Sequence, residues 1–185
     1  TRKSSGATMT DCTAEKVIVP LSSDQKWLLG RTSMPQMVYD CPSYFNMGVG
    51  TDLVTTPKLN ALVRLLTKDL KKVGSILIYS RYKEAQRCIQ EVLADYNIDS
   101  YILNGDSSQE EREAIIDKFK LGDIRVLITN VQKGLNFGNC NYCIFYTYDP
   151  NPNKMVQFEG RMTRSFNIHD KHVYLLLSVG KELDT

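Results

Sequence analysis

Glycine-rich phosphate-binding motifs are missing from this sequence. No G-x-x-x-x-G-K-[S/T] segment occurs, because Gly180-Lys181 has other residues around it, and Gly48-Val49-Gly50 lacks the third glycine of G-x-G-x-x-G. The first motif cradles nucleotide phosphates and supplies a hydroxyl to Mg²⁺, and the second approaches a dinucleotide pyrophosphate. This chain by itself is therefore not a complete P-loop ATPase, and a Rossmann-type dinucleotide site is not expected.

Long apolar runs and a strong excess of charge are also missing. No stretch approaches the roughly 20 apolar residues of a membrane-spanning helix, and the basic start at residues 1–6 lacks the apolar segment that follows in a signal peptide. The net charge is only +2 over 185 residues, so any nucleic-acid site must be a local patch. The sequence predicts a globular chain without membrane contact, whose Ser/Thr-rich residues 1 to about 13 are disordered.

The cysteines do not form a disulfide framework. There are five, an odd number at irregular spacing, which is typical of reduced intracellular thiols. Cys140 and Cys143 form a C-x-x-C, and His169 and His172 follow as H-x-x-H, which suggests zinc. However, both the gap to His169 and the histidine spacing differ from the zinc-finger pattern, and Cys143 lies in an apolar run. The sequence therefore predicts no metal site.

Regular apolar periodicity begins at Thr56. Thr56 suits a helix N-cap and Pro57 the first helical position, and helical segments then alternate with short apolar runs. The runs expected to be strands are residues 17–19, 75–79, 101–103, 126–129, 144–146 and 173–177. Continuous apolar strands alternating with helices favour a mainly parallel sheet of about five or six strands, covered on both faces. We expect a partly disordered lead-in at 1–55, with one helix near Ser23–Leu29, and an α/β lobe at 56–185.

Ligands of an open parallel sheet bind at the carboxyl ends of its strands. One segment that follows a predicted strand, Gln157 to Arg164, reads Q-x-x-G-R-x-x-R. On a helix, Arg161 and Arg164 project together, with Gln157 one turn earlier. Two guanidiniums side by side suit a polyphosphate, because each planar fork binds oxygens bidentately. Taken alone, the segment is better explained by two arginines on a solvated helix.

The loop after residues 126–129 is a second candidate. Thr129 ends a strand and can offer its hydroxyl to a phosphate, Gly134 allows close backbone approach, and Asn136 could hold a sugar hydroxyl or a nucleotide edge. An ordinary strand-to-loop exit explains the same residues when they are taken alone. The remaining candidate loops for a ligand site follow two other predicted strands. They are Ser80-Arg81 and Asn104-Gly105-Asp106.

Taken in order, these segments resemble the C-terminal lobe of superfamily 2 helicases, and within it the Swi/Snf-type translocases. The resemblance covers roughly residues 55–180. Residues 56–59 look like the start of that lobe, 76–80 like motif IV, 101–112 like the next conserved block, 129–136 like motif V and 157–164 like motif VI. Residues 19–25 are similar to the segment that joins the two lobes. Four motifs in this order at strand ends are specific, and they favour the functional interpretation of each.

The resemblance implies a RecA-like three-layer α/β/α lobe with a P-loop NTPase-type fold that lacks the P-loop. In this family ATP lies in a cleft between two lobes, and the first lobe supplies the P-loop and most of the Mg²⁺ ligands. Arg161 and Arg164 would be arginine fingers supported by Gln157, and Gly134 and Asn136 would line the nucleotide. The resemblance thus implies ATP and Mg²⁺ as cofactors, the N-terminal lobe of the same protein as a partner, and an isolated lobe that does not hydrolyse ATP.

The second implied partner is nucleic acid, with DNA preferred over RNA. The residues implied to contact its phosphates are Ser80, Arg81, Gly105 and Thr129. Thr163 stands where Swi/Snf enzymes usually carry histidine, Ser165-Phe166-Asn167 replaces their Ile-Gly-Gln, and Lys133 replaces a common glycine. These departures favour a bacterial or phage relative acting in the cytoplasm over a nuclear eukaryotic remodeller.

Two other classes of protein are open alternatives. The first is a RecA-like nucleic-acid-binding or scaffolding domain without a motor partner, which a P-loop and a D-E-x-H box upstream in the gene would exclude. The second is another Rossmann-like enzyme such as a methyltransferase. The lack of a glycine-rich first turn and the presence of Q-x-x-G-R-x-x-R both argue against that enzyme.

Overall fold

A computed structural model describes residues 12–45, 55–131, 140–148 and 171–178. Within these residues, six strands form one sheet in the order β1-β6-β5-β2-β4-β3, and every neighbouring pair is parallel. The strands are β1 (Cys12–Val19), β2 (Ile76–Tyr79), β3 (Ser100–Leu103), β4 (Val126–Thr129), β5 (Tyr142–Phe145) and β6 (Lys171–Ser178). The predicted α/β class with a parallel sheet is confirmed.

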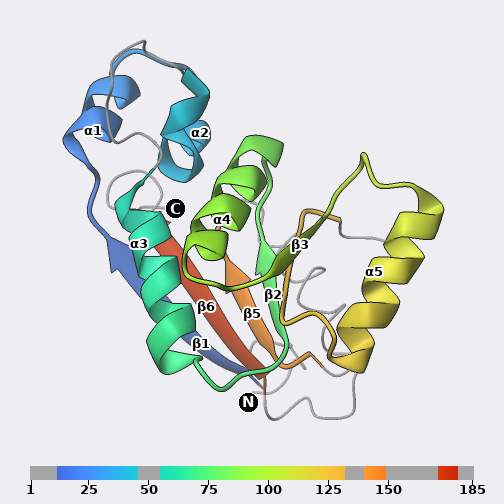
Figure 1. The fold of residues 1–185 in the computed structure, drawn as a ribbon. Helices are drawn as coiled ribbons and strands as arrows, with labels where there is room; N and C mark the ends of the chain where they lie inside the picture. Colours follow the sequence, from blue (N-terminus) through green and yellow to red (C-terminus); the bar gives the residue numbers. More distant parts are fainter. Residues whose placement is uncertain (1–11, 46–54, 132–139, 149–170, 179–185) are drawn as a thin grey trace, which may run out of the picture.

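Helices connect β1 to β2, β2 to β3 and β3 to β4 (Figure 1). They are α1 (Ser23–Leu29), α2 (Pro35–Asp40), the 3₁₀ helix η2 (Pro42–Phe45), α3 (Pro57–Arg64) with its π-helical continuation η3 (Leu65–Asp69), α4 (Lys83–Asp95) and α5 (Gln109–Leu121). The helix expected near Ser23–Leu29 is α1, whereas α2 and η2 were not expected. The helix expected at about 154–164 lies outside the described residues. None of the helices in the described ranges is long and apolar enough to cross a membrane.

The two faces of the sheet carry separate apolar clusters. Ile76 and Ile78 of β2 pack with apolar side chains of α3 and α4, whereas Leu77 packs with Phe119 of α5 on the opposite face. Figure 1 shows α3 and α4 side by side over the sheet. Because successive strand residues point to opposite faces, a strand covered on both sides needs apolar residues throughout. This requirement explains the continuous apolar runs in the sequence.

Side chains and one glycine set the ends of the helices. The Thr56 hydroxyl accepts from the Leu59 N–H at 3.1 Å at the start of α3, and Ser108 forms a reciprocal capping box with Glu111 at the start of α5. Gly122 ends α5 in the left-handed conformation, at φ 84°. These local contacts satisfy backbone groups that the helices leave free, and the Thr56 cap is the one expected from the sequence.

The lead-in contributes a strand to the same sheet as the lobe. β1 pairs with β6 along its whole length, from Cys12 opposite Lys171 to Val19 opposite Ser178. In Figure 1, α1 and α2 then lie together beyond the sheet, where the buried Gln25 donates to the Val38 carbonyl at 3.0 Å. The division at residues 55 and 56 stays a prediction.

We predict that Gly122→Ala destabilises the chain by about 1–2 kcal/mol, because an alanine is strained at positive φ. A Cβ at Gly122 would meet no atom within 4 Å, so the cost would be purely conformational. Gly74 is the matched control, since its site is equally open and its φ is not positive. Urea unfolding should show no loss for Gly74→Ala; equal losses in both variants would contradict this account.

Candidate functional site

The carboxyl ends of four strands meet at one edge of the sheet. Tyr79, the last residue of β2, lies opposite Thr129 of β4 and Phe145 of β5, and Thr129 lies opposite Leu103 of β3. The residues that follow these strands are therefore neighbours, although they are far apart in the sequence. This is the edge at which open parallel sheets bind ligands.

The backbone of Arg81 is held from both sides at this edge. Its N–H donates to the Thr147 hydroxyl at 2.9 Å, and its carbonyl accepts from the Asn130 side chain at 3.0 Å. The Arg81 side chain is exposed, with its guanidinium 5.4 Å from the centroid of the Tyr82 ring. In the described part of the chain no carboxylate forms a salt bridge with it. The site thus presents a positioned backbone with an accessible positive charge.

A buried glutamine connects the exits of β2 and β3. Gln86 of α4 is fully buried, donates to the Ser80 carbonyl at 2.7 Å and accepts from the Asn104 side chain at 2.9 Å. The Asn104 side-chain oxygen in turn accepts from the Asp106 N–H at 2.9 Å. The turn that carries the exposed Gly105 is therefore tethered to the strand exit that carries Arg81.

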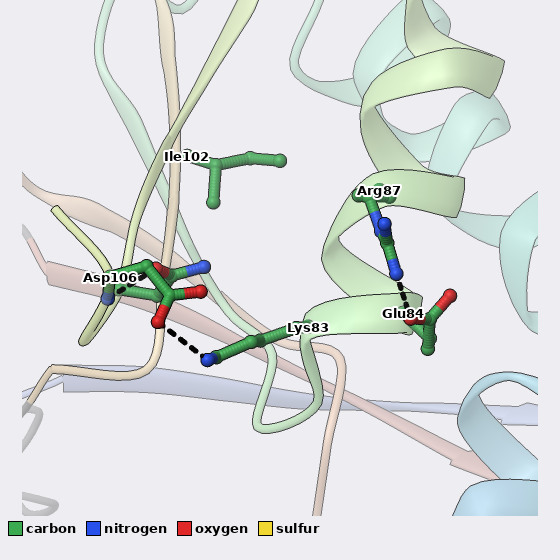
Figure 2. Close-up of a pocket in the computed structure, with 6 residues that line it drawn as sticks. Lys83, Glu84, Arg87, Ile102 and Asp106 are labelled. Carbon is green, nitrogen blue, oxygen red and sulfur yellow. Dashed lines mark hydrogen bonds and ion pairs between the residues drawn. The ribbon is translucent and has the colours of Figure 1, made fainter.

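A pocket of about 240 Å³ lies beside this turn (Figure 2). It is lined by Lys83, Glu84, Arg87, Ile102, Asn104 and Asp106. Lys83 pairs with Asp106 at 2.7 Å, and Arg87 pairs with Glu84, as the dashed lines in Figure 2 show. Each cation of the pocket has a carboxylate partner, so the charges balance and the pocket has no strong preference for anions.

Beneath the edge, a fully buried ion pair joins the lead-in to the lobe. The Lys58 Nζ lies 2.9 Å from the Asp40 carboxylate, and both side chains are 0% exposed. Lys58 also donates to the Tyr146 carbonyl at 3.0 Å, and the Thr147 hydroxyl donates to Asp40 at 2.6 Å. Because Thr147 accepts from Arg81, hydrogen bonds run from α2 to the exposed site.

The buried Tyr146 belongs to the same network. Its hydroxyl donates to the Asp40 carbonyl at 3.3 Å. Burial, and secondly the charge of Asp40, raise the pKa of the Tyr146 phenol well above its usual range. Tyr146 therefore stays protonated and remains a hydrogen-bond donor at any physiological pH.

The structure separates the predicted phosphate-contacting residues into two pairs. Arg81 and Gly105 are exposed, whereas Ser80 and Thr129 are 0% exposed. The Thr129 hydroxyl accepts from the Val131 N–H at 3.0 Å, so it supports its own loop. The Ser80 hydroxyl has no hydrogen-bond partner in the described part of the chain. The predicted nucleotide and catalytic residues, Gly134, Asn136, Gln157, Arg161 and Arg164, lie outside the described residues.

Several residues of this edge were not identified from the sequence. They are Asp40, Lys58, Gln86, Asn130 and Thr147. A weak signal existed for Lys58, which stands one turn before Leu62 on the apolar side of α3. Nothing local distinguishes Thr147 from other polar residues after strands, because its two partners come from distant segments.

The C-x-x-C cysteines lie in the apolar core. Cys140 is 1% exposed and Cys143 is 0% exposed, and burial raises the pKa of the Cys140 thiol to about 12. The His172 ring stacks on Tyr142 at 4.6 Å between centroids, and His169 is outside the described residues. Over the described ranges, no three His, Cys, Asp or Glu side chains are grouped as metal ligands.

The fold and its carboxyl edge define a RecA-like α/β lobe. The helicase conserved C-terminal domain matches residues 57–166, more than half of this chain, and the chain belongs to that family. The resemblance to the C-terminal lobe of superfamily 2 helicases is therefore confirmed.

Curated relatives include proteins named for DNA and for RNA. Mouse DNA repair and recombination protein RAD54B is 28% identical over 130 residues, covering 66% of this chain and 15% of its own length. The ATP-dependent RNA helicase DeaD of Buchnera aphidicola is 30% identical over 115 residues, covering 61% of this chain and 19% of its own length. The chain thus spans about a fifth or less of these relatives.

Solved Swi2/Snf2 structures share the fold. The Sulfolobus solfataricus SWI2/SNF2 ATPase core in complex with dsDNA has a TM-score of 0.72 at 18% identity, covering 92% of this chain and 42% of that one. The C-terminal domain of the same ATPase has a TM-score of 0.66 at 16% identity, covering 94% and 83%. The second comparison shows that nearly the whole fold corresponds to a single lobe.

We predict that Lys58→Met lowers the free energy of unfolding by about 3–5 kcal/mol, because it leaves the Asp40 charge buried without its partner. Lys68→Met is the matched control, since Lys68 is exposed, and it should change stability by about 0.5 kcal/mol or less. Urea unfolding of both variants measures the difference. A loss below about 1 kcal/mol for Lys58→Met would show that the pair does not hold the lead-in on the lobe.

Proposed function

We propose that this chain is the second motor lobe of a nucleic-acid-dependent ATPase, which contacts one strand of DNA through phosphates at the carboxyl edge of its sheet. Membership of the helicase C-terminal domain family supports an ATP-dependent helicase or translocase as the whole protein. We choose DNA because the similar proteins include a DNA recombination protein and a SWI2/SNF2 core with dsDNA, although others, such as DeaD, are named for RNA.

The observation that carries this proposal is the geometry of Arg81. Its backbone is held by Thr147 after β5 and by Asn130 after β4, while its guanidinium is exposed. A guanidinium on a fixed backbone binds phosphate oxygens with less loss of conformational freedom than one on a flexible loop. Contacts to phosphates carry little sequence information, which suits a protein that moves along DNA.

The other predicted contact residues fit the same surface. Gly105 is exposed in a turn that Gln86 connects to the Arg81 loop, and a Cβ at Gly105 would meet no atom within 4 Å. A phosphate can therefore approach the backbone of this turn closely. We assign Ser80 and Thr129, which are buried, to supporting the surface from beneath.

The nucleotide side of the proposal rests on residues outside the described ranges. Gln157, Arg161 and Arg164 would face ATP across the cleft from the P-loop and Mg²⁺ ligands of the N-terminal lobe, and Gly134 and Asn136 would line the nucleotide. The two guanidiniums would stabilise negative charge on the transferring phosphoryl group. Without the N-terminal lobe, half of the pocket is missing, so we expect this chain alone to hydrolyse no ATP.

We predict that Arg81→Gln weakens the binding of single-stranded DNA by about fivefold at low salt, because one charge-assisted phosphate contact is lost. For two to four phosphate contacts, log K of the unsubstituted chain should fall with log salt at a slope of about −1.4 to −2.8, and the variant should lose about 0.7 of that slope. Fluorescence anisotropy over a salt series on duplexes and single strands measures both quantities.

Arg31→Gln is the matched control for Arg81→Gln. It removes the same charge from the end of α1, which follows β1 rather than one of the four strands of the site, and the Arg31 guanidinium lies 4.0 Å from the Trp27 ring. Its slope should be close to that of the unsubstituted chain. Equal effects of both substitutions would mean that Arg81 contributes only through the net charge of the chain. A strong preference for one DNA sequence would contradict binding through the phosphate backbone.

We further predict that Arg161→Ala or Arg164→Ala in the full-length motor reduces nucleic-acid-stimulated kcat by about 10³- to 10⁵-fold, because arginine fingers contribute about that much. The Kd for ATP should change little, and lysine should not restore the rate, because it lacks the planar fork. Steady-state ATPase assays, nucleotide titration and melting curves separate these effects. A kcat within a few-fold of the unsubstituted motor for both alanine variants would refute the motif VI assignment.

A further inference from the structure

Two cysteines from distant parts of the chain meet where η2 packs on α4. The Cys41 and Cys88 sulfurs are 3.6 Å apart, although the residues are 47 positions apart in sequence. The Ser43 hydroxyl lies 3.3 Å from the first sulfur and 3.5 Å from the second. Cys41 is 2% exposed, whereas Cys88 is only partly buried. One thiol is therefore open to a small oxidant and the other is sheltered directly behind it.

We propose that Cys88 and Cys41 form an oxidation site, in which a peroxide reacts at Cys88 and the product closes to a disulfide that joins the lead-in to α4. A disulfide needs an S–S distance of about 2.05 Å, so the two sulfurs must approach by about 1.5 Å. The proposal requires that rotation of the two side chains closes this gap. The site acts independently of nucleotide and nucleic acid.

The local hydrogen bonds make Cys88 the reactive thiol of the pair. The hydrogen bond from the Cys41 thiol, together with that from Ser43 and the charge of Arg87, lowers the pKa of Cys88 to about 6, although burial and Glu91 act in the opposite direction. The hydrogen bond to Cys88 and burial raise the pKa of Cys41. In the proposed assignment Cys88 is the thiolate and Cys41 is the thiol beside it, which the partial exposure of Cys88 and the burial of Cys41 also favour.

The neighbouring Tyr146 does not titrate in the same range. It faces the pair from the exit of β5, and burial keeps the pKa of its phenol far above neutral pH. The charge that changes near pH 6 is therefore that of Cys88. Since the thiolate is the nucleophile, the oxidation rate should rise as the pH rises through about 6 and then level off.

The proposed chemistry consumes one peroxide per chain. The Cys88 thiolate attacks a peroxide oxygen, so that an S–O bond forms, the O–O bond breaks, and the leaving hydroxide takes up a proton to become water. The Cys41 sulfur then attacks the sulfur of the Cys88 sulfenic acid. The S–S bond forms, the S–O bond breaks, and the departing hydroxide leaves as water with the Cys41 proton. Two thiols are oxidised by two electrons, and hydrogen peroxide is reduced to two waters.

Two other cysteines do not compete for this reaction. Cys140 and Cys143 belong to the cluster under α5, on the opposite face of the sheet, and both are buried. Cys41 belongs to the cluster under α3 and α4, and Cys88 packs against that cluster. Oxidation should therefore favour the pair over Cys140 and Cys143.

The decisive experiment treats the full chain with hydrogen peroxide and maps its peptides without reduction. We expect one intramolecular Cys41–Cys88 cross-link, a mass loss of about 2 Da from two hydrogens, and reversal by dithiothreitol. The cross-link should raise Tm by about 5–10 °C, because it closes a long loop of the unfolded chain. Oxidation of Cys88 to sulfinic acid without a cross-link, or a cross-link only between chains, would overturn the proposal.

Three variants assign the two roles. Cys41→Ser should accumulate a sulfenic acid at Cys88 that dimedone labels, Cys88→Ser should show neither product, and the control Cys140→Ala should form the cross-link like the unsubstituted chain. If a serine variant does not fold, the unsubstituted chain still tests the proposal, because its cross-link and its Tm shift are measured without any substitution. Dimedone labelling at Cys41 instead of Cys88, or a rate that does not change between pH 5 and pH 7, where Cys88 gains its charge, would also overturn the assignment.

Discussion

The buried ion pair between Lys58 and Asp40 connects three parts of the chain that the sequence keeps apart. Removing two charges from water costs several kcal/mol for each ion, and the pair offsets this cost only when further hydrogen bonds satisfy both groups. Here Lys58 also donates to the Tyr146 carbonyl, and Asp40 also accepts from Thr147. The lead-in, the start of α3 and the exit of β5 can therefore satisfy these groups only in one arrangement.

The hydrogen bonds around this ion pair continue to the surface that we propose binds nucleic acid. Thr147 uses its hydroxyl twice, as a donor to Asp40 and as an acceptor from the Arg81 N–H. The position of the Arg81 backbone thus depends on a carboxylate that belongs to the lead-in. A motor lobe needs a fixed contact to the phosphate backbone if closure of its cleft is to become movement along DNA, and a buried polar network provides that rigidity.

Two of the cations at this surface are paired with carboxylates, and this balance of charge also fits a motor. Lys83 and Arg87 are paired with carboxylates, whereas the exposed Arg81 forms no salt bridge within the described residues. A lobe with few phosphate contacts binds weakly and releases easily, as a repeating cycle requires. The lead-in that positions Arg81 also contains Cys41. Oxidation of the Cys41–Cys88 pair would therefore join the lead-in to α4 by a covalent bond.

The amino-acid sequence by itself determined the features that depend on neighbours along the chain. The buried strands of the lobe, the N-cap of α3 at Thr56 and the helix at Ser23–Leu29 were all readable, because apolar periodicity and caps act within a few residues. Motif order along the chain was sufficient to indicate the family. Arg81 and Gly105 are exposed at strand exits, and their contact with phosphates stays a prediction.

Only the tertiary structure decided the strand order, the pairing of β1 with β6, and which polar residues are buried. Ser80 and Thr129 stand at strand exits as predicted, yet both side chains are 0% exposed, and the sequence did not indicate this burial. Lys58, Gln86 and Thr147 look like ordinary polar residues in the sequence. Their partners are supplied by segments tens of residues away, and a hydrogen bond of that kind leaves no local pattern, since its energy depends on geometry that exists only after the sheet has formed.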